Sequence, residues 1–309
     1  MKIISLFCGC GGMDLGFLKA GHEIIWANDF DKDSCNTYET FFGHKPVCAP
    51  IEEIKSEDIP DGDVVIGGFP CQGFSIANPY RKTEDSRNRL YLEMLRIIKE
   101  KKPKYFVGEN VTGLCSIGGY ENKEDKIQHK GKILKMILKD FEEAGYDVEF
   151  KILNSADFGV PQTRRRVLIL GTRKDIPHKL KHPKPTHKKE EWKTAGEALE
   201  GLPLDYSNNI PNHQGTSHKV KINGHIGNRA TNPNKPSPTI VGRGGGTGGP
   251  VIIPHPKGHR RMSVRETARL QGFPDDFIFE GAISSQYRQI GNAVPWLLAY
   301  NVAKMIPKD

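Results

Sequence analysis

The sequence predicts an α/β fold, in which a large domain built on a mostly parallel sheet is followed by a small irregular domain. Up to about residue 174, short apolar runs alternate with amphipathic stretches. This alternation is typical of a parallel sheet that helices cover on both faces. Between residues 172 and 262 the periodicity fades, and proline-rich pieces and a glycine-rich run take its place. We expect a main domain over residues 1–174, completed by residues 285–309, a second domain over residues 175–270, and a hinge over residues 271–284.

The elements of the main domain follow from residue periodicity. Apolar residues recur at helical spacing over residues 90–98 and 133–141, which predicts two amphipathic helices. Ser263 and Glu266 have the spacing of a capping box, so a helix should begin there and run through Leu270. Pro295 suits the first turn of a last helix, which we expect to pack on the main domain. Six apolar runs are predicted to be strands, namely residues 3–7, 24–27, 64–66, 105–107, 148–152 and 167–170.

The composition favours a cytoplasmic protein. No apolar run approaches the ~20 residues needed to cross a bilayer, and the apolar start is too short for a secretory signal. The six cysteines contain no Cys-x-x-Cys pair and no disulfide-framework spacing, which favours a reduced intracellular protein. Cys8 and Cys10 have no second Cys or His pair nearby, so no metal site is expected.

The net charge of +8 is concentrated in one segment. Residues 172–262 (the basic segment below) hold sixteen Lys and Arg residues against six Asp and Glu residues. A balance this one-sided favours binding to phosphate groups, because Lys and Arg side chains neutralise them. A solvated basic linker is the alternative interpretation.

A glycine-rich turn follows the first predicted strand. It contains Phe7, Gly9, Gly11 and Gly12, and glycines there let the backbone approach a ligand closely. Asp29 follows the second predicted strand about 20 residues further on, where a carboxylate can accept hydrogen bonds from both hydroxyls of a ribose. Together these residues predict a nucleoside-containing cofactor, with NAD and S-adenosylmethionine both open at this point. A plain turn would explain the glycines alone.

Two candidate catalytic groups follow two other predicted strands. Cys71 comes after the strand at 64–66, in the run Gly-Gly-Phe-Pro-Cys-Gln-Gly-Phe-Ser, and Glu109 comes directly after the strand at 105–107. Both side chains should lie at the carboxyl edge of the sheet, where open α/β sheets build their sites. A thiolate is a strong nucleophile, and a partly desolvated carboxyl can donate a proton or a hydrogen bond to a ring nitrogen. A structural cysteine and a helix-capping glutamate are the alternatives.

A basic run leads into the last predicted strand. Alternation places Arg164 and Arg166 on one face of this strand and Arg165 on the other. Two guanidinium groups beside the catalytic edge can hold a carboxylate, polarise a carbonyl or grip a phosphate. A basic edge strand that its charges keep soluble would have the same pattern.

Taken in order, these motifs point to one family. The chain resembles the cytosine-5 DNA methyltransferases of bacteria and archaea, and the resemblance covers almost all of it. One such motif would be weak, but several in the family's order and with suitable gaps are highly specific. The resemblance rests on the glycine loop at 7–12, Gly-Phe-Pro-Cys-Gln at 68–72, Glu-Asn-Val at 109–111, Gln-x-Arg-x-Arg at 162–166, the blocks at 265–269 and 271–274, and Gln-Ile-Gly-Asn-Ala-Val-Pro at 289–295.

The resemblance implies a Rossmann-like methyltransferase domain with a small target-recognition domain. Such an enzyme moves a methyl group from S-adenosylmethionine to C5 of a cytosine that is flipped out of duplex DNA. Cys71 would form a covalent bond to C6 of the base, while Glu109 stabilises the charge that develops at N3. Arg164 and Arg166 would orient Glu109 and contact the base or its phosphate. The implied cofactor-binding residues are Phe7, Gly9, Gly11, Gly12, Asp29, Phe30, Ile51, Pro70, Leu90, Asn292 and Val294.

The sequence departs from the family pattern at a few positions. Ser5 stands where an aspartate is common, and Asp29 replaces the more usual glutamate. Pro50 precedes Ile51, where an aspartate often binds the adenine amino group, and proline offers no acceptor side chain. Ile51 and Leu90 would still sandwich the adenine ring.

Double-stranded DNA is the implied partner, and Arg243 is a candidate for reading guanine through a bidentate contact. We also expect a cognate restriction endonuclease as a functional partner, a monomeric protein, and association with the nucleoid when DNA is bound. The rivals are an RNA cytosine-5 methyltransferase, whose Cys-Phe-Thr signature is absent here, an inactive DNA-binding regulator, and an NAD-linked oxidoreductase. The expected DNA-contacting residues are Gln72, Ser75, Arg87, Arg165, Arg229, Arg243 and Arg260.

Overall fold

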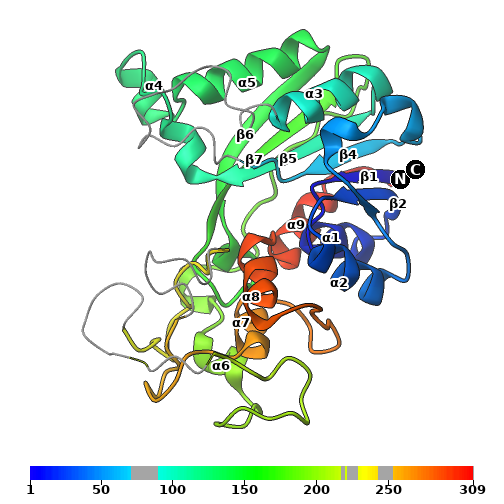
Figure 1. Ribbon diagram of the computed structural model, residues 1–309. Coiled ribbons are helices and arrows are strands. Elements are labelled where there is room, and N and C mark those ends of the chain that lie inside the picture. Colours follow the sequence, from blue (N-terminus) through cyan, green and yellow to red (C-terminus); the bar gives the residue numbers. More distant parts are fainter. Residues whose placement is uncertain (71–89, 217–219, 221–228, 243–252, 309) are drawn as a thin grey trace.

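A seven-stranded sheet forms the centre of the larger lobe of the molecule (Figure 1). The structure is a computed structural model that describes residues 1–70, 90–216, 220, 229–242 and 253–308. The strand order is β3-β2-β1-β4-β5-β7-β6. Neighbours from β3 to β5 pair in parallel, whereas β7 is antiparallel to both β5 and β6, so the prediction of a mostly parallel sheet is confirmed. The strands are β1 (Lys2–Leu6), β2 (Glu23–Asp29), β3 (Val47–Cys48), β4 (Val64–Gly67), β5 (Tyr105–Val111), β6 (Tyr146–Asn154) and β7 (Arg165–Arg173).

Helices cover both faces of this sheet because alternate residues of its strands point to opposite sides. On one face, Ile3 and Val64 belong to a buried cluster with residues of α1 and α9. On the other face, Ile4 and Val65 belong to a second cluster with residues of α3 and α5. The described helices are α1 (Gly12–Lys19), α2 (Lys32–Phe42), α3 (Leu90–Lys101), α4 (Lys123–Ile127), α5 (Lys132–Glu143), α6 (Ala195–Leu199), α7 (Val264–Leu270), α8 (Ile283–Asn292) and α9 (Trp296–Ala303).

The strand order reverses beside β1. The chain runs outward from β1 to β2 and β3, then returns to β4 on the other side of β1 and continues to β5. Open α/β sheets bind their ligands at the carboxyl ends of the strands at such a reversal. The fold therefore places a candidate site above the ends of β1 and β4.

The last helix packs on the main domain, as the sequence predicted, and there it contacts the first helix. Helix α9 packs along α1, and both lie close to β1 and β2 (Figure 1). A Cβ atom at Gly16 would lie 2.6 Å from the Cβ of Ala299, so only glycine lets the two helices approach this closely. The imidazole Nε2 of His22 also lies 3.1 Å from the carbonyl oxygen of Ala303.

The smaller lobe contains α6 and α7 and is mostly irregular over its described residues (Figure 1). Helix α7 begins with the capping box formed by Ser263 and Glu266, which confirms the predicted helix. In the segment 271–284, Phe273, Phe277 and Phe279 are buried against one another, and its hinge role stays a prediction. None of the helices in the described residues is long and apolar enough to cross a membrane.

Candidate active site

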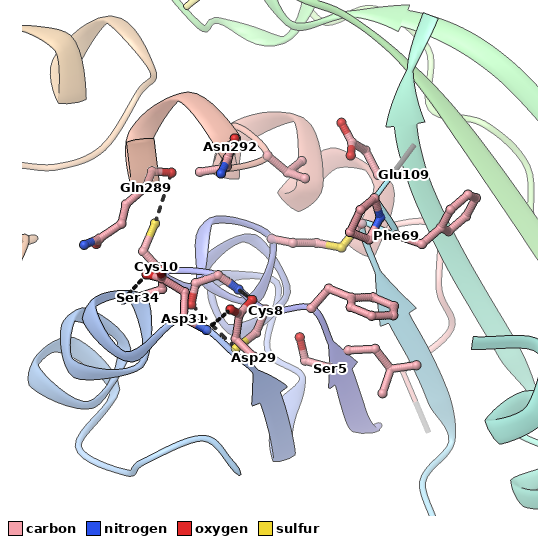
Figure 2. Close-up of a pocket in the computed structure, with 18 of the residues that line it drawn as sticks. Ser5, Cys8, Cys10, Asp29, Asp31, Ser34, Phe69, Glu109, Gln289 and Asn292 are labelled. Carbon is pink, nitrogen blue, oxygen red and sulfur yellow. Dashed lines mark hydrogen bonds between the residues drawn. The ribbon is translucent and has the colours of Figure 1, made fainter. Parts of the chain in front are cut away.

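A cavity of about 470 Å³ opens at the point beside β1 where the strand order reverses. The ends of β1, β2, β4 and β5 form its floor and sides, and the end of α8 closes it from above. Glu109 and Phe69 lie together at one end of the cavity, and Asp29 and Asp31 lie at the other (Figure 2). The lining residues that sequence analysis named as site residues are Phe7, Gly9, Asp29, Phe30, Pro70, Glu109, Asn292 and Val294.

The glycine-rich loop turns sharply between β1 and α1. Phe7 has a φ of 53°, a left-handed conformation that is uncommon for a residue other than glycine. Gly9 and Gly11 also have positive φ values, of 55° and 91°. A Cβ atom at Gly12 would overlap the carbonyl oxygen of Val294, so this glycine permits close contact with the segment after α8. Gly11 and Gly12 therefore shape the loop, but neither lines the cavity.

Asp29 anchors this loop at the end of β2. Its Oδ2 accepts a hydrogen bond of 2.8 Å from the Gly9 N–H, and its Oδ1 accepts one of 2.9 Å from the Asp31 N–H. The side chain is buried, and this burial raises the pKa of the carboxyl above its ordinary value. Each carboxylate oxygen retains a lone pair for a further donor, such as a ribose hydroxyl.

Glu109 is fixed by one of the predicted arginines. The Nε of Arg166, near the start of β7, lies 2.8 Å from Oε1 of Glu109, near the end of β5. Both side chains are about one-tenth exposed, so this ion pair is largely shielded from water. The expectation that Arg166 orients Glu109 agrees with this geometry.

The segment that precedes Cys71 is held against the same strand. Asn110 donates a hydrogen bond of 2.9 Å from Nδ2 to the carbonyl oxygen of Phe69, and its Oδ1 accepts one from the Val111 N–H. Pro70 lines the cavity beside Glu109. Cys71 itself lies outside the described residues.

Arg164 has hydrogen-bond partners other than Glu109, so its expected share in orienting Glu109 or contacting the base or its phosphate stays a prediction. Its side chain is 1% exposed, and its guanidinium donates to the backbone carbonyl oxygens of Ile240, Gly291 and Ala293. The two arginines share a face of the chain, as alternation predicted. The sequence could not reveal their different partners, because those of Arg164 come from segments that are distant along the chain.

Two groups of residues that line the cavity were not among the site residues predicted from the sequence. Asp14 on α1 is fully buried, and burial raises the pKa of its carboxyl to about 6. Its Oδ1 accepts a hydrogen bond of 3.0 Å from the Tyr38 hydroxyl, while its Oδ2 has no partner among the described residues. At the rim, Arg288 on α8 pairs with Asp31 at 2.8 Å. Among these residues, the only local sequence pattern is the Asp31-x-x-Ser34 spacing, which is typical of a helix cap.

Two predicted cofactor contacts lie away from the cavity. Ile51 is 3% exposed and is buried in the cluster beneath α3, and Leu90 packs against the same cluster at the start of α3. Neither residue lines the cavity. Their side chains contribute to the core, and the adenine contacts that the family resemblance implies for them stay a prediction.

The structure describes three of the predicted DNA-contacting residues, namely Arg165, Arg229 and Arg260. Arg165 and Arg229 are exposed. Arg260 instead donates to both carboxylate oxygens of Glu266, at 2.6 and 2.7 Å, and stacks over Tyr206. This internal ion pair, together with bonds to the Leu204 carbonyl oxygen, makes Arg260 a structural residue of the smaller lobe. Gln72, Ser75, Arg87 and Arg243 lie outside the described residues.

A reversal-point cavity with a carboxylate on β2 and an arginine-bound glutamate on β5 is typical of a nucleoside-dependent transferase. The C-5 cytosine-specific DNA methylase family model matches residues 1–308. The chain therefore belongs to this family and is a DNA cytosine-5 methyltransferase.

Curated relatives and solved structures agree with this assignment. The type II methyltransferase M.NgoFVII of Neisseria gonorrhoeae is 40% identical over 99% of this chain and 86% of its own length. M.MthTI of Methanothermobacter thermautotrophicus is 38% identical over 100% of this chain and 98% of its own length. A DNA modification methyltransferase encoded within an Escherichia coli prophage has a TM-score of 0.70 at 26% identity, covering 99% of this chain and 98% of that one. The Entamoeba histolytica methyltransferase EhMeth, with a TM-score of 0.73 at 17% identity over 99% of this chain and 97% of that one, shares the fold.

Proposed function

We propose that this protein flips a cytosine out of duplex DNA and methylates its C5, with S-adenosylmethionine as cofactor and a covalent bond to Cys71. One arrangement carries the proposal. Glu109, held by Arg166, and the Phe69–Pro70 backbone, held by Asn110, line one wall of the cavity. Cys71 is the next residue in the sequence.

The cavity has groups that suit S-adenosylmethionine. Its volume of about 470 Å³ lies within the ~300–1,000 Å³ range of small-molecule sites. Asp29 would hold the ribose hydroxyls, and Phe7 and Phe30 offer aromatic surface to the base and the sulfonium chain. The bound cofactor would supply an electrophilic methyl group. NAD is a poorer fit, because hydride transfer has no use for a cysteine and a glutamate side by side.

The side chains would activate a carbon that is a weak nucleophile. As the Cys71 thiolate forms its bond to C6, the electrons of the C5–C6 double bond move into the ring, and C5 becomes nucleophilic. Glu109 would hydrogen-bond or protonate N3 and so stabilise this charge. After C5 is methylated, loss of the C5 proton to a base returns an electron pair to the ring and expels the thiolate.

The basic segment would offset the cost of flipping. Unstacking one base costs a few kcal/mol, and contacts between Lys or Arg and phosphates can supply that energy. Arg165 and Arg229 are exposed and remain candidates for such contacts. We propose duplex DNA as the substrate in preference to RNA, since the Cys-Phe-Thr signature of the RNA-acting branch is absent.

The decisive experiment measures methyl transfer from labelled S-adenosylmethionine to duplex DNA and, in parallel, to tRNA. Cys71→Ala should abolish transfer to the duplex while duplex binding in a gel-shift assay stays within about two-fold. Cys48→Ala is a matched control, because Cys48 is exposed and does not line the cavity. Full turnover by Cys71→Ala would show that the reaction does not use the thiol. Methyl transfer to tRNA alone would show that the substrate is RNA and not duplex DNA.

The biological setting is proposed by analogy with the type II methyltransferases among its relatives. We place the protein, as a monomer, with a cognate restriction endonuclease and with the nucleoid in the cytoplasm, because its substrate is chromosomal DNA. Sequencing modified cytosines in DNA from cells that express the protein would give its target. Failure of that modification to protect DNA from any endonuclease encoded beside it would argue for a stand-alone role.

A further inference from the structure

Arg164 is a buried cation without an acidic partner among the described residues. Its side chain is 1% exposed, and its Nε has no hydrogen-bond partner there. Burial and the nearby Arg166 lower the pKa of its guanidinium, and the Glu109 carboxylate, which is bound to Arg166, opposes this shift. A buried charge that forms no ion pair of its own is costly, and packing alone could be achieved by an apolar side chain. We therefore expect Arg164 to have a role other than packing in the core.

The guanidinium joins two backbone segments that belong to different parts of the enzyme. Nη1 donates at 2.5 Å to the carbonyl oxygen of Ile240, in the basic segment. Nη2 donates at 2.9 and 3.1 Å to the carbonyl oxygens of Gly291 and Ala293, at the end of α8. Asn292 and Ala293 line the cofactor cavity. One side chain thus connects the backbone of the basic segment directly to the cavity wall.

The same two segments are in tight contact and are linked a second time. A Cβ atom at Gly242 would overlap the side-chain amide of Asn292, and one at Gly291 would overlap the backbone of Val241, so the two segments touch. Oε1 of Gln162 accepts a hydrogen bond of 2.9 Å from the Ile240 N–H, and its Nε2 donates to Oε1 of Gln271 at 2.5 Å. Gln271 in turn donates to the Ala293 carbonyl oxygen at 2.6 Å. Residues 240–242 are therefore joined to the cavity wall by several direct contacts.

We propose that Arg164 is a positioning residue that couples DNA binding to cofactor binding. DNA would order residues 240–242, and the cofactor would order residues 292–294. Because these two segments are joined, binding of either ligand would strengthen binding of the other. Thermodynamic linkage makes the effect reciprocal. This inference rests on the proposed function, since it takes S-adenosylmethionine and duplex DNA as the two ligands.

The test compares cofactor affinity with and without DNA. Equilibrium dialysis of labelled S-adenosylmethionine, with and without a saturating unmethylated duplex, gives the factor by which the duplex tightens cofactor binding. For the unaltered protein we expect a factor in the range of about 5–150. Arg164→Met, which keeps the length but removes the donors, should bring the factor within about two-fold of one. Arg164→Lys, which keeps the charge, should recover part of it, and Lys151→Met, on the exposed side of β6, is the matched control.

The outcomes separate this inference from the proposed function. A factor near one in the unaltered protein, or an undiminished factor in Arg164→Met, overturns the coupling role. If Arg164 only stabilises the fold, the variants will unfold earlier in urea but keep the factor at low temperature. If Arg164→Met does not fold, the factor in Arg164→Lys decides the matter. Methyl transfer by the unaltered protein tests the proposed function on its own, because the coupling is measured by binding.

Discussion

Replacing Asp14 by asparagine should make the protein more stable at neutral pH and leave it almost unchanged in acid. Burial raises the pKa of this carboxyl from 3.8 to about 6, so folding disfavours its ionised form. The difference corresponds to about 3 kcal/mol, at about 1.4 kcal/mol for each tenfold change in the ionisation constant. Because the pKa is higher in the folded protein, the stability that Asp14 contributes is fully present below about pH 4. It is lost as the pH rises through about 6.

The assay is urea unfolding of both proteins between pH 4 and pH 8. Asparagine cannot ionise but can still accept the hydrogen bond from Tyr38, so the stability of the variant relative to the unaltered protein should rise by about 3 kcal/mol from pH 4 to pH 8. The difference between the two curves cancels the other ionising groups. Glu57→Gln, the same change at an exposed position, shows what an amide substitution does by itself. A difference that does not vary with pH would refute the reasoning.

Four further outcomes follow from the described geometry. Gly16→Ala should cost about 1–3 kcal/mol in urea unfolding, because its Cβ would lie 2.6 Å from Ala299, and an unchanged midpoint would mean that α9 shifts freely. Glu109→Gln should slow single-turnover methyl transfer about 10²–10³-fold, and a rate near that of the unaltered protein would exclude Glu109 from charge stabilisation. Arg288→Ala breaks a partly exposed ion pair with Asp31, so the free energy of unfolding should fall by less than about 1 kcal/mol. Equilibrium dialysis should show weaker cofactor binding, and unchanged binding would exclude a role for Arg288 at the rim of the cavity. Affinity for unrelated duplexes should fall as salt rises in filter-binding titrations, whereas a flat dependence would contradict phosphate binding by the basic segment.

The sheet and one half of the site could be predicted because their signals are local. A buried strand followed by a glycine turn fixes where Gly9 lies, and the carboxylate about 20 residues further on reaches its N–H from the next strand. Glu109 was found for the same reason, since the parallel strands β4 and β5 end at the same edge of the sheet.

The other half of the site depends on contacts between distant segments. The alternation that placed Arg164 and Arg166 on one face was correct, yet it contains no information on where residues 240 and 291 lie. Ile51 shows a limit of another kind. An apolar residue suits a ring-binding site and a core equally well, and here the side chain of Ile51 is buried in the cluster beneath α3, so its cofactor contact stays a prediction.

The contact between α9 and α1 also constrains how the enzyme is made. The glycine loop and β1 leave the ribosome well before α8, which completes the cavity wall, and α9, which packs on α1, because these helices follow more than 270 residues later. At ordinary rates of translation this delay is on the order of tens of seconds. Throughout that interval the apolar face of α1 lacks its partner, so the nascent chain has to be shielded there, and the cavity wall is incomplete until α8 has emerged.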